Sequence, residues 1–222
     1  MKKCVIVGAG EFVEKDYHMF LEHENRKEIL LIAADGGMSY LQNQSQEPDY
    51  VIGDFDSILP TDRVNLDLPK WDERKIILPE QKDDTDMLAA IRLGMEKGCM
   101  EFHIFGGMGG RFDHTLANIQ CMDFIVSLGG RACMYGNGQR VVVIQNGRLL
   151  FSKENQGMIS IFALSDVAVG VTLEGLKYPL HEYTLTKKYP IGISNSFLGM
   201  ESVVSVREGS LLICYEYIGG ET

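Results

Sequence analysis

Short runs of apolar residues recur through the first 135 positions of the chain and alternate with segments of mixed character. Several runs are apolar throughout, which is typical of parallel strands that are covered on both faces. We predict strands at residues 3–8, 29–33, 50–53, 75–78, 102–105 and 131–135.

Two segments between these strands have the spacing of an amphipathic helix. In residues 85–97, Leu88, Ile91 and Met95 recur at intervals of three and four, and Gly98 is suited to end the helix. A second helix is predicted at residues 115–128. Strands that alternate with helices predict an α/β fold with a mainly parallel sheet flanked by helices.

The pattern changes after residue 136. Turn signals occur at residues 136–138 (Gly-Asn-Gly) and 146–147 (Asn-Gly), and no later segment has a convincing helical period. Later strands are predicted at residues 158–163, 167–173, 180–186, 202–206 and 211–217. We therefore expect an α/β domain at residues 1–136 and a smaller all-β sandwich or barrel at residues 137–222.

Composition narrows the class of protein. The chain has 222 residues, 45% hydrophobic and 23% charged, as in ordinary globular proteins. A formal net charge of -10 argues against a nucleic-acid partner, because neutralising phosphates needs clustered Lys and Arg. The five cysteines are scattered, which indicates buried free thiols. No apolar stretch approaches the roughly 20 residues of a membrane-spanning helix, so we expect a cytoplasmic protein with no membrane partner.

The first candidate for chemistry is Gly-Asp-Phe-Asp-Ser at residues 53–57, directly after an apolar strand. If the strand continues, its period of two places Asp54 and Asp56 on one side. Such a pair at the carboxyl end of a parallel strand lies where α/β sheets bind ligands, and it offers the oxygen ligands that Mg²⁺ prefers. A solvated turn rich in aspartate is the alternative, and this segment alone leaves it open.

A second acidic segment, Lys-Asp-Asp-Thr-Asp at residues 82–86, lies at the start of the first predicted helix. In the simplest interpretation, Asp83 or Asp84 caps that helix. Capping needs one carboxylate, however, and helical residues three apart share a face, so Asp83 and Asp86 are candidates for a metal or phosphoryl role. Lys82 is either a phosphate ligand or an ordinary surface lysine.

The third candidate is the glycine-rich segment at residues 106–115, between a strand and a helix. Four glycines allow close approach of the main chain to a ligand, and the start of the following helix favours an anion. The segment lacks the Gly-Lys-Ser/Thr ending of a Walker A loop. An earlier Gly-Ala-Gly at residues 8–10 is only a weak signal.

Several polar residues are candidate partners of a nucleotide. Arg111 suits phosphate oxygens, and Asp113 is a candidate for a helix cap or a metal ligand. His114 and Asn118 lie one helical turn apart, although a structural role for His114 stays open. Asp35 follows a strand and precedes two glycines, so we expect it at the same crevice. No Ser-His-Asp set and no zinc-ligand spacing stands out, which leaves metal-assisted phosphoryl chemistry as the leading class.

Taken in order, four motifs closely resemble those of the thiamine pyrophosphokinase family. They are residues 34–37 (ADGG), 53–57 (GDFDS), 82–86 (KDDTD) and 109–118 (GGRFDHTLAN). Further along, residues 174–180 (EGLKYPL) and 194–196 (SNS) resemble the family's thiamine-binding domain. The resemblance spans nearly the whole chain, and the order and spacing of the motifs make it specific.

The resemblance implies a thiamine diphosphokinase that transfers an intact diphosphate from ATP to the thiamine hydroxyl, with Mg²⁺ as cofactor and AMP as the second product. It implies that residues 1–136 bind ATP and Mg²⁺ and that residues 137–222 bind thiamine. It also implies a homodimer with thiamine near the subunit interface.

The resemblance further assigns residues at the matching motif positions. The implied catalytic carboxylates are Asp54, Asp56, Asp83 and Asp86, with Mg²⁺ on Asp54, Asp56 and Asp86. The implied nucleotide-binding residues are Asp35, Lys82, Arg111, Asp113, His114 and Asn118. The implied thiamine-binding residues are Ser194, Asn195 and Tyr178. Some members have a tryptophan where this chain has Tyr178, whereas its only tryptophan, Trp71, lies in the first domain.

Two other classes of function fit the residues. A metal-dependent phosphoesterase would also use aspartates with a nearby histidine, and would release phosphate without an acceptor. A non-catalytic module would bind nucleotide or thiamine without turnover, although so many carboxylates are hard to explain for binding alone.

Overall fold

The computed structural model describes residues 2–55, 66, 68–79, 84–136 and 138–217. The chain divides into two compact units. The first consists of Met1–Cys121 and Met134–Asn137, and the second of Met122–Cys133 and Gly138–Thr222. No helix in the described part of the chain is both long enough and apolar enough to cross a membrane.

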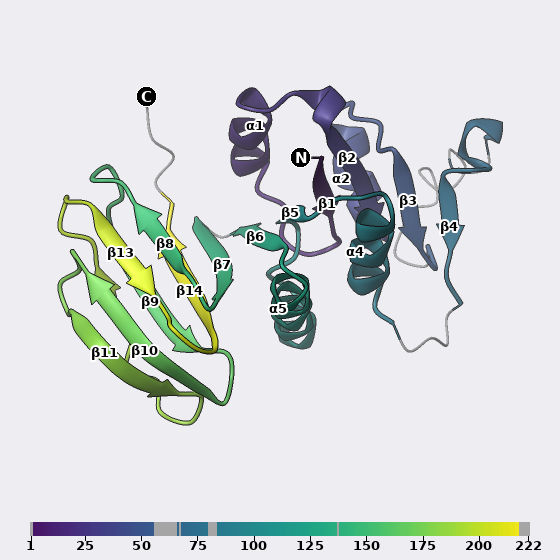
Figure 1. The fold of residues 1–222 in the computed structure, drawn as a ribbon. Coiled ribbons are helices and arrows are strands. Elements are labelled where there is room, and N and C mark those ends of the chain that lie inside the picture. Colours follow the sequence, from purple (N-terminus) through teal and green to yellow (C-terminus); the bar gives the residue numbers. More distant parts are fainter. Residues whose placement is uncertain (1, 56–65, 67, 80–83, 137, 218–222) are drawn as a thin grey trace. The chain divides into compact units, whose positions relative to one another are not determined.

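The first unit is built on five parallel strands in the order β5-β1-β2-β3-β4 (Figure 1). The strands are β1 (Lys3–Val7), β2 (Ile29–Ala34), β3 (Tyr50–Gly53), β4 (Lys75–Ile77) and β5 (Glu101–Phe105). The helices are α1 (Glu14–Glu22), α2 (Gly37–Asn43), α4 (Asp86–Glu96) and α5 (Phe112–Ser127), with 3-10 turns at Arg26–Glu28 and Pro69–Trp71. The end of α5, from Met122, belongs to the second unit. The expected parallel sheet flanked by helices is thereby confirmed.

Burial explains why these strands read as continuous apolar runs. Every residue of β2 is buried, and so is every residue of β1 after Lys3. Because helices cover both faces of such a sheet, alternation between polar and apolar positions is lost. Strand β6 (Arg131–Gly136) follows β5 in the sheet order, and its residues are divided between the two units.

Two helices of the first unit were not predicted, and a third begins earlier than predicted. The helix α1 buries only Asp16 and Tyr17, so its apolar period is faint. The helix α2 begins within a Gly-Gly pair that reads as a turn. The helix α5 begins at Phe112 rather than at residue 115, because the glycine-rich turn ends sooner than the composition suggests.

The second unit is a sandwich of two antiparallel sheets, which confirms the expected all-β region (Figure 1). One sheet has the order β12-β9-β14-β7 and the other β11-β10-β13-β8. The strands are β7 (Gln139–Gln145), β8 (Arg148–Phe151), β9 (Met158–Ala163), β10 (Val167–Glu174), β11 (Leu180–Thr186), β12 (Asn195–Ser196), β13 (Ser202–Ser205) and β14 (Ser210–Glu216). Buried side chains of both sheets form one core, among them Ile161 and Ile213 from the first sheet and Val171 and Val204 from the second. Strands β7, β8 and β12 were not predicted.

Candidate functional site

Polar and glycine-rich features gather at the carboxyl edge of the parallel sheet. Asp35 directly follows β2, Asp54 directly follows β3, and the glycine-rich turn, residues 106–110, directly follows β5. Asp86 is the first residue of α4, which packs against β1, β2 and β3. Because the carboxyl ends of parallel strands share one edge, these features belong to one face of the first unit, where α/β sheets bind ligands.

The main chains of the first two aspartate segments are in contact. The Asp35 N–H donates to the carbonyl oxygen of Ile52 at 2.8 Å. A Cβ atom on Gly53 would lie 3.1 Å from the Cα atom of Asp35, so the glycine permits this approach. Asp35 has a φ of 48°, a left-handed conformation that aspartate tolerates better than most residues. The structure therefore brings Asp35 next to the residue that precedes Asp54.

The predicted alternation of Asp54 and Asp56 along a continuing strand does not occur. The strand β3 ends at Gly53, and Phe55 has a φ of 62°, which is incompatible with an extended chain. Phe55 is also buried, so the chain turns here to place an aromatic side chain in the core. Asp56 lies outside the described residues.

The start of α4 differs from the prediction in which residue caps it. Thr85 is the N-cap, and its hydroxyl accepts a hydrogen bond from the Leu88 N–H at 3.2 Å. Neither Asp83 nor Asp84 is the cap, because the helix begins one residue after Thr85. The expected helical spacing of Asp83 and Asp86 involves a residue outside the described part of the chain, although Asp86 itself is the first residue of the helix.

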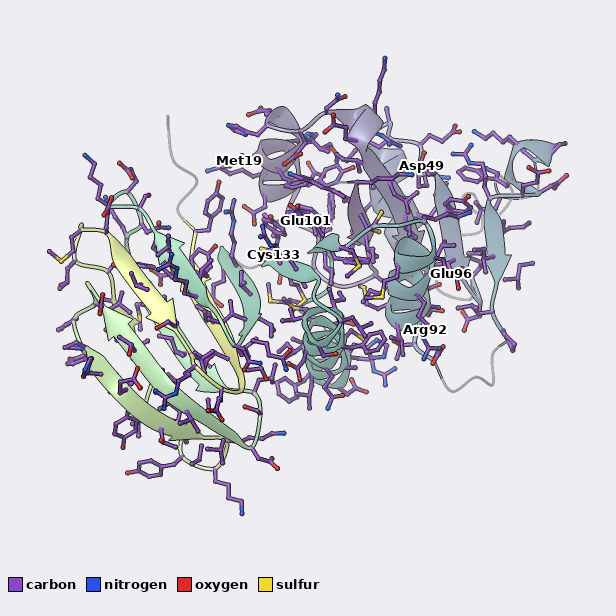
Figure 2. The ribbon with its side chains drawn as sticks, viewed as in Figure 1. Met19, Asp49, Arg92, Glu96, Glu101 and Cys133 are labelled. Atoms are coloured by element: carbon purple, nitrogen blue, oxygen red, sulfur yellow. The ribbon has the colours of Figure 1, made fainter. Side chains whose placement is uncertain are left out.

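The acidic residues around Thr85 have different environments. Asp84 pairs with Arg92, which projects from α4 with a side chain that is 53% exposed (Figure 2). Asp86 is half-buried in the first turn of the helix, where the helix dipole favours a carboxylate. Lys82 and Asp83 lie outside the described residues.

The glycine-rich turn is braced by the segment that follows β1. The Gly10 N–H donates to the carbonyl of Gly106 at 2.8 Å, and the Glu11 N–H donates to the carbonyl of Met108 at 2.7 Å. A Cβ atom on Gly106 would overlap the carbonyl oxygen of Gly8, and the φ of Gly106 is 64°. The early Gly-Ala-Gly, a weak signal in the sequence, thus supports the turn. The sequence feature that could have indicated this role is that both glycine segments, residues 8–10 and 106–110, directly follow an apolar strand.

The helix α5 carries three of the sequence-predicted site residues, Asp113, His114 and Asn118, and a fourth, Arg111, directly precedes it. The Arg111 guanidinium, just before the helix, donates from Nε to Asp113 Oδ1 at 3.2 Å and from Nη2 to Asp113 Oδ2 at 2.6 Å. This bond lowers the pKa of Asp113 and raises that of Arg111. Both residues are exposed, as is His114. Asn118 is buried instead, and its Nδ2 donates to the Gly107 carbonyl at 2.7 Å, so it holds the turn.

In the second unit, the structure brings Tyr178 and Asn195 together. The segment of residues 176–179, here called the Tyr178 loop, connects β10 to β11. Asn195 is 2% exposed and bonds the main chain of Tyr178, whose ring is exposed. Ser194 is exposed and has a φ of 59°. Of the three predicted thiamine residues, only Ser194 and Tyr178 are thus open to solvent.

The donor set at the sheet edge suits Mg²⁺ in its chemistry, because Asp35, Asp54 and Asp86 offer only carboxylate oxygens. Within the described ranges, no three His, Cys, Asp or Glu side chains are grouped closely enough to hold a metal ion. Two of the four predicted carboxylates, Asp56 and Asp83, fall outside those ranges. Asp35, Asp54 and Asp86 thus offer the kind of ligand that a hard cation prefers, but the described residues alone do not form a grouped metal site.

Comparison with known proteins covers both units. The family model for the catalytic domain of thiamin pyrophosphokinase matches residues 21–127, and the model for its vitamin B1 binding domain matches residues 148–212. The chain is 30% identical to thiamine pyrophosphokinase of Bacillus subtilis (strain 168), over 96% of this chain and 98% of that protein.

Solved structures resemble the chain over nearly its full length. The crystal structure of thiamine pyrophosphokinase from Bacillus subtilis aligns with a TM-score of 0.84 and 27% identity, covering 98% of this chain and 100% of that one. The yeast thiamin pyrophosphokinase structure aligns with a TM-score of 0.77 and 14% identity, covering 97% of this chain and 86% of that one. The second match is a likeness of fold alone.

Proposed function

The chain belongs to the thiamin pyrophosphokinase family, and we propose that it carries out its thiamine diphosphokinase reaction at the carboxyl edge of the parallel sheet. An intact diphosphate passes from ATP to the hydroxyl of thiamine, which gives thiamine diphosphate and AMP. One observation carries the choice of site. Asp35, Asp54, Asp86 and the glycine-rich turn all lie at that edge and all fall within the matched catalytic region.

Mg²⁺ is the proposed cofactor, held by Asp54, Asp56 and Asp86. Carboxylate oxygens are the ligands that Mg²⁺ prefers, and Asp54 and Asp86 follow β3 and begin α4 at the same edge. When bound, the ion offsets charge on the transferred phosphates. Asp83 is the fourth proposed catalytic carboxylate. Asp56 and Asp83 are both proposed from the resemblance of their motifs to those of the family.

The chain's own residues then bind ATP and handle one proton. The glycine-rich turn and the start of α5 offer main-chain N–H groups to phosphate oxygens. Around them, the proposed nucleotide-binding residues are Asp35, Lys82, Arg111, Asp113, His114 and Asn118. Arg111 is exposed and positively charged, so it can leave Asp113 for a phosphate at small cost. We assign to Asp86 the acceptance of the proton that leaves the thiamine hydroxyl.

Thiamine is proposed to bind in the second unit at the site formed by Ser194, Asn195 and Tyr178, all of which lie in the region matched by the vitamin B1 binding model. The corresponding domains are residues 1–136 for catalysis and residues 137–222 for thiamine. We further propose a cytoplasmic homodimer with thiamine near the subunit interface. Exposed apolar residues such as Tyr189, Ile193 and Leu198 are consistent with an interface on the second unit.

Product analysis tests the function directly. Purified protein is incubated with ATP, Mg²⁺ and thiamine, and nucleotides and thiamine esters are separated by chromatography. We expect AMP and thiamine diphosphate in equal amounts, and no AMP when thiamine is omitted. Phosphate release without thiamine would instead indicate a phosphoesterase. Binding of ATP or thiamine without any product would indicate a non-catalytic module.

A further inference from the structure

Three of the four hydrogen-bonding positions of the Asn195 side chain are occupied by the protein main chain. Its Oδ1 accepts hydrogen bonds from the N–H groups of Tyr178 and Ser196, each at 2.9 Å. Its Nδ2 donates to the carbonyl oxygen of Tyr178 at 2.7 Å. An amide oxygen has two acceptor sites, so both are used, and one N–H of the amide group remains.

Because Asn195 is buried, a ligand cannot reach the remaining N–H of its side chain. Asn195 is 2% exposed, whereas the neighbouring Ser194 is exposed and Tyr178 is 58% exposed. A substrate that bonded Asn195 would first have to displace the Tyr178 main chain, leaving buried polar groups without partners. Direct recognition of thiamine by Asn195 is therefore unfavourable in this arrangement.

The contacts around Asn195 make the Tyr178 loop a rigid support. The Lys177 N–H donates to the carbonyl of Ser196 at 3.0 Å, and Leu176 forms a β-bridge with Phe197 in the core. Pro179 follows Tyr178 and restricts its main chain further. Within this support, Asn195 alone fixes both the N–H and the carbonyl of Tyr178 among the bonds described.

We propose that Asn195 is a positioning residue, which presents the Tyr178 ring to the cationic heteroaromatic ring of thiamine and does not itself touch the substrate. This proposal rests on the function proposed above. The Lys177 Nζ lies 5.4 Å from the centre of the Tyr178 ring, so this ring already accepts a cation at its face. The thiazolium ring of thiamine is also a cation, and an electron-rich aromatic face attracts it.

A double-mutant cycle distinguishes positioning from contact. Asn195→Ala should raise the KM for thiamine on the order of 10-fold, as expected for the loss of the two hydrogen bonds that hold the Tyr178 main chain, and leave the KM for ATP unchanged. In a Tyr178→Ala background, the same substitution should change the KM for thiamine by less than about twofold, because nothing is left to position. Independent effects that multiply in the double variant would mean that Asn195 contacts thiamine and would overturn the proposal.

Two further variants separate positioning from general damage. Asn195→Asp keeps an acceptor for the Tyr178 and Ser196 N–H groups but sets a second, negatively charged oxygen against the Tyr178 carbonyl in place of the donor, so it should also raise the KM for thiamine and leave the KM for ATP unchanged. The matched control is Asn146→Gly, since Asn146 Oδ1 accepts from the Gly209 N–H at 2.8 Å and glycine tolerates its φ of 46°. An equal rise in KM for both substrates in the Asn195 variants, or the same rise in the control, would contradict the proposal.

Hydrogen exchange keeps this inference separate from the proposed function. Asn195→Ala should speed exchange of the Tyr178 and Ser196 amides, which lose their acceptor, while the Ile161 amide, bonded to the Gly192 carbonyl at 2.9 Å, should stay protected. If wild-type protein made no thiamine diphosphate but exchange changed in this way, the proposed function would fail and the support of Tyr178 by Asn195 would stand. Unchanged exchange would overturn the positioning role whatever the activity.

Discussion

The glycine-rich turn of the first unit and the Tyr178 loop of the second are each held by one buried asparagine. Asn118 donates to the carbonyl of Gly107 at 2.7 Å, and Asn195 donates to the carbonyl of Tyr178 at the same distance. The supports differ in what else they contain. The turn is also fixed by main-chain hydrogen bonds to Gly10 and Glu11. In the Tyr178 loop, Asn195 both accepts from the Tyr178 N–H and donates to the Tyr178 carbonyl.

Under the proposed function, this difference indicates how each site would meet its substrate. A turn that offers main-chain N–H groups to phosphates must bring backbones close together, so it needs glycine and tolerates few side chains. A loop that offers an aromatic ring can carry ordinary residues, provided that one polar side chain fixes its main chain. We therefore expect substitutions in the first unit to affect catalysis and stability, and those around Tyr178 to affect thiamine binding.

The largest effect should follow from Asp54→Asn. Loss of one carboxylate at the proposed phosphoryl site should lower kcat on the order of 10²-fold or more, because a strong electrostatic element of the transition state is removed. The KM for thiamine should stay nearly constant, since the second unit is unaltered. Steady-state kinetics check both values. The control is Asp72→Asn, an exposed aspartate that precedes β4 at the opposite end of the strands. Normal turnover in Asp54→Asn would remove this residue from the mechanism.

A pair of glycine substitutions tests whether close backbone approach fixes the turn. Gly106 and Gly110 both have a φ of 64°, but only Gly106 has a neighbour, the Gly8 carbonyl, where a Cβ atom would lie. Gly110→Ala should cost about 1–2 kcal/mol for its conformation alone. Gly106→Ala should cost about 1–3 kcal/mol more from steric overlap. Urea unfolding followed by the fluorescence of Trp71, the single tryptophan, reports on the first unit. Equal costs would show that the turn is not tightly packed.

The apolar pattern of the sequence predicts where several of the buried strands begin and end. It does not predict the conformation of the polar segments that follow them. The bounds of β3, β9 and β11 agree with the prediction, because apolar runs with clear turn signals leave little choice. At Asn146-Gly147 the turn is present, but β7 and β8 pair in different sheets, a long-range choice that local residues do not encode.

The same contrast applies to the site residues, whose positions at strand ends could be predicted but whose conformation could not. Aspartates and glycines at strand ends point to an edge of the sheet, so Asp35, Asp54 and Asp86 could be found from the sequence. The conformation around them could not, since Phe55 enters the core and breaks the alternation that was expected for Asp54. The role of Asn195 was also hidden, because a side chain that bonds a distant main chain leaves no periodic signal.

A third prediction concerns acid, which should weaken the first unit. His103 on β5 is 11% exposed, and its ring bonds Tyr135 on β6 at 2.9 Å and Glu101 on β5 at 3.0 Å (Figure 2 labels Glu101). Burial lowers the pKa of His103, against the effect of Glu101. Burial acts to raise the pKa of Glu101, but bonds from His103 and Lys3 lower it overall. Among the described residues, Lys3 on β1 and Glu24, which follows α1, are the other charged groups that act on this ring.

The sign of the effect follows from these pKa shifts. A histidine with a lowered pKa binds its proton more tightly when unfolded, so its stabilisation is present above its ordinary pKa of 6.5 and is lost as the pH falls below it. Glu101 adds a loss in the same direction at lower pH. The free energy of unfolding of the first unit, followed by Trp71 fluorescence, should therefore be lower at about pH 5.5 than at about pH 7.5, and His103→Gln should reduce this difference. The control is His181→Gln in the second unit, where the histidine is exposed. The same pH response in all three proteins would contradict the assignment.

The smallest effect should come from the N-cap of α4, which is the hydroxyl of Thr85 and not one of the predicted aspartates. Thr85→Ala removes the acceptor for the Leu88 N–H and should lower the free energy of unfolding of the first unit by about 1 kcal/mol. Asp84→Asn should change it by less than about 0.5 kcal/mol, because it removes only a partly exposed ion pair with Arg92. Urea unfolding measures both. A larger loss for Asp84→Asn than for Thr85→Ala would restore the carboxylate as the cap. In the order expected here, the hydroxyl of Thr85, and not the carboxylate of Asp84, stabilises the start of α4.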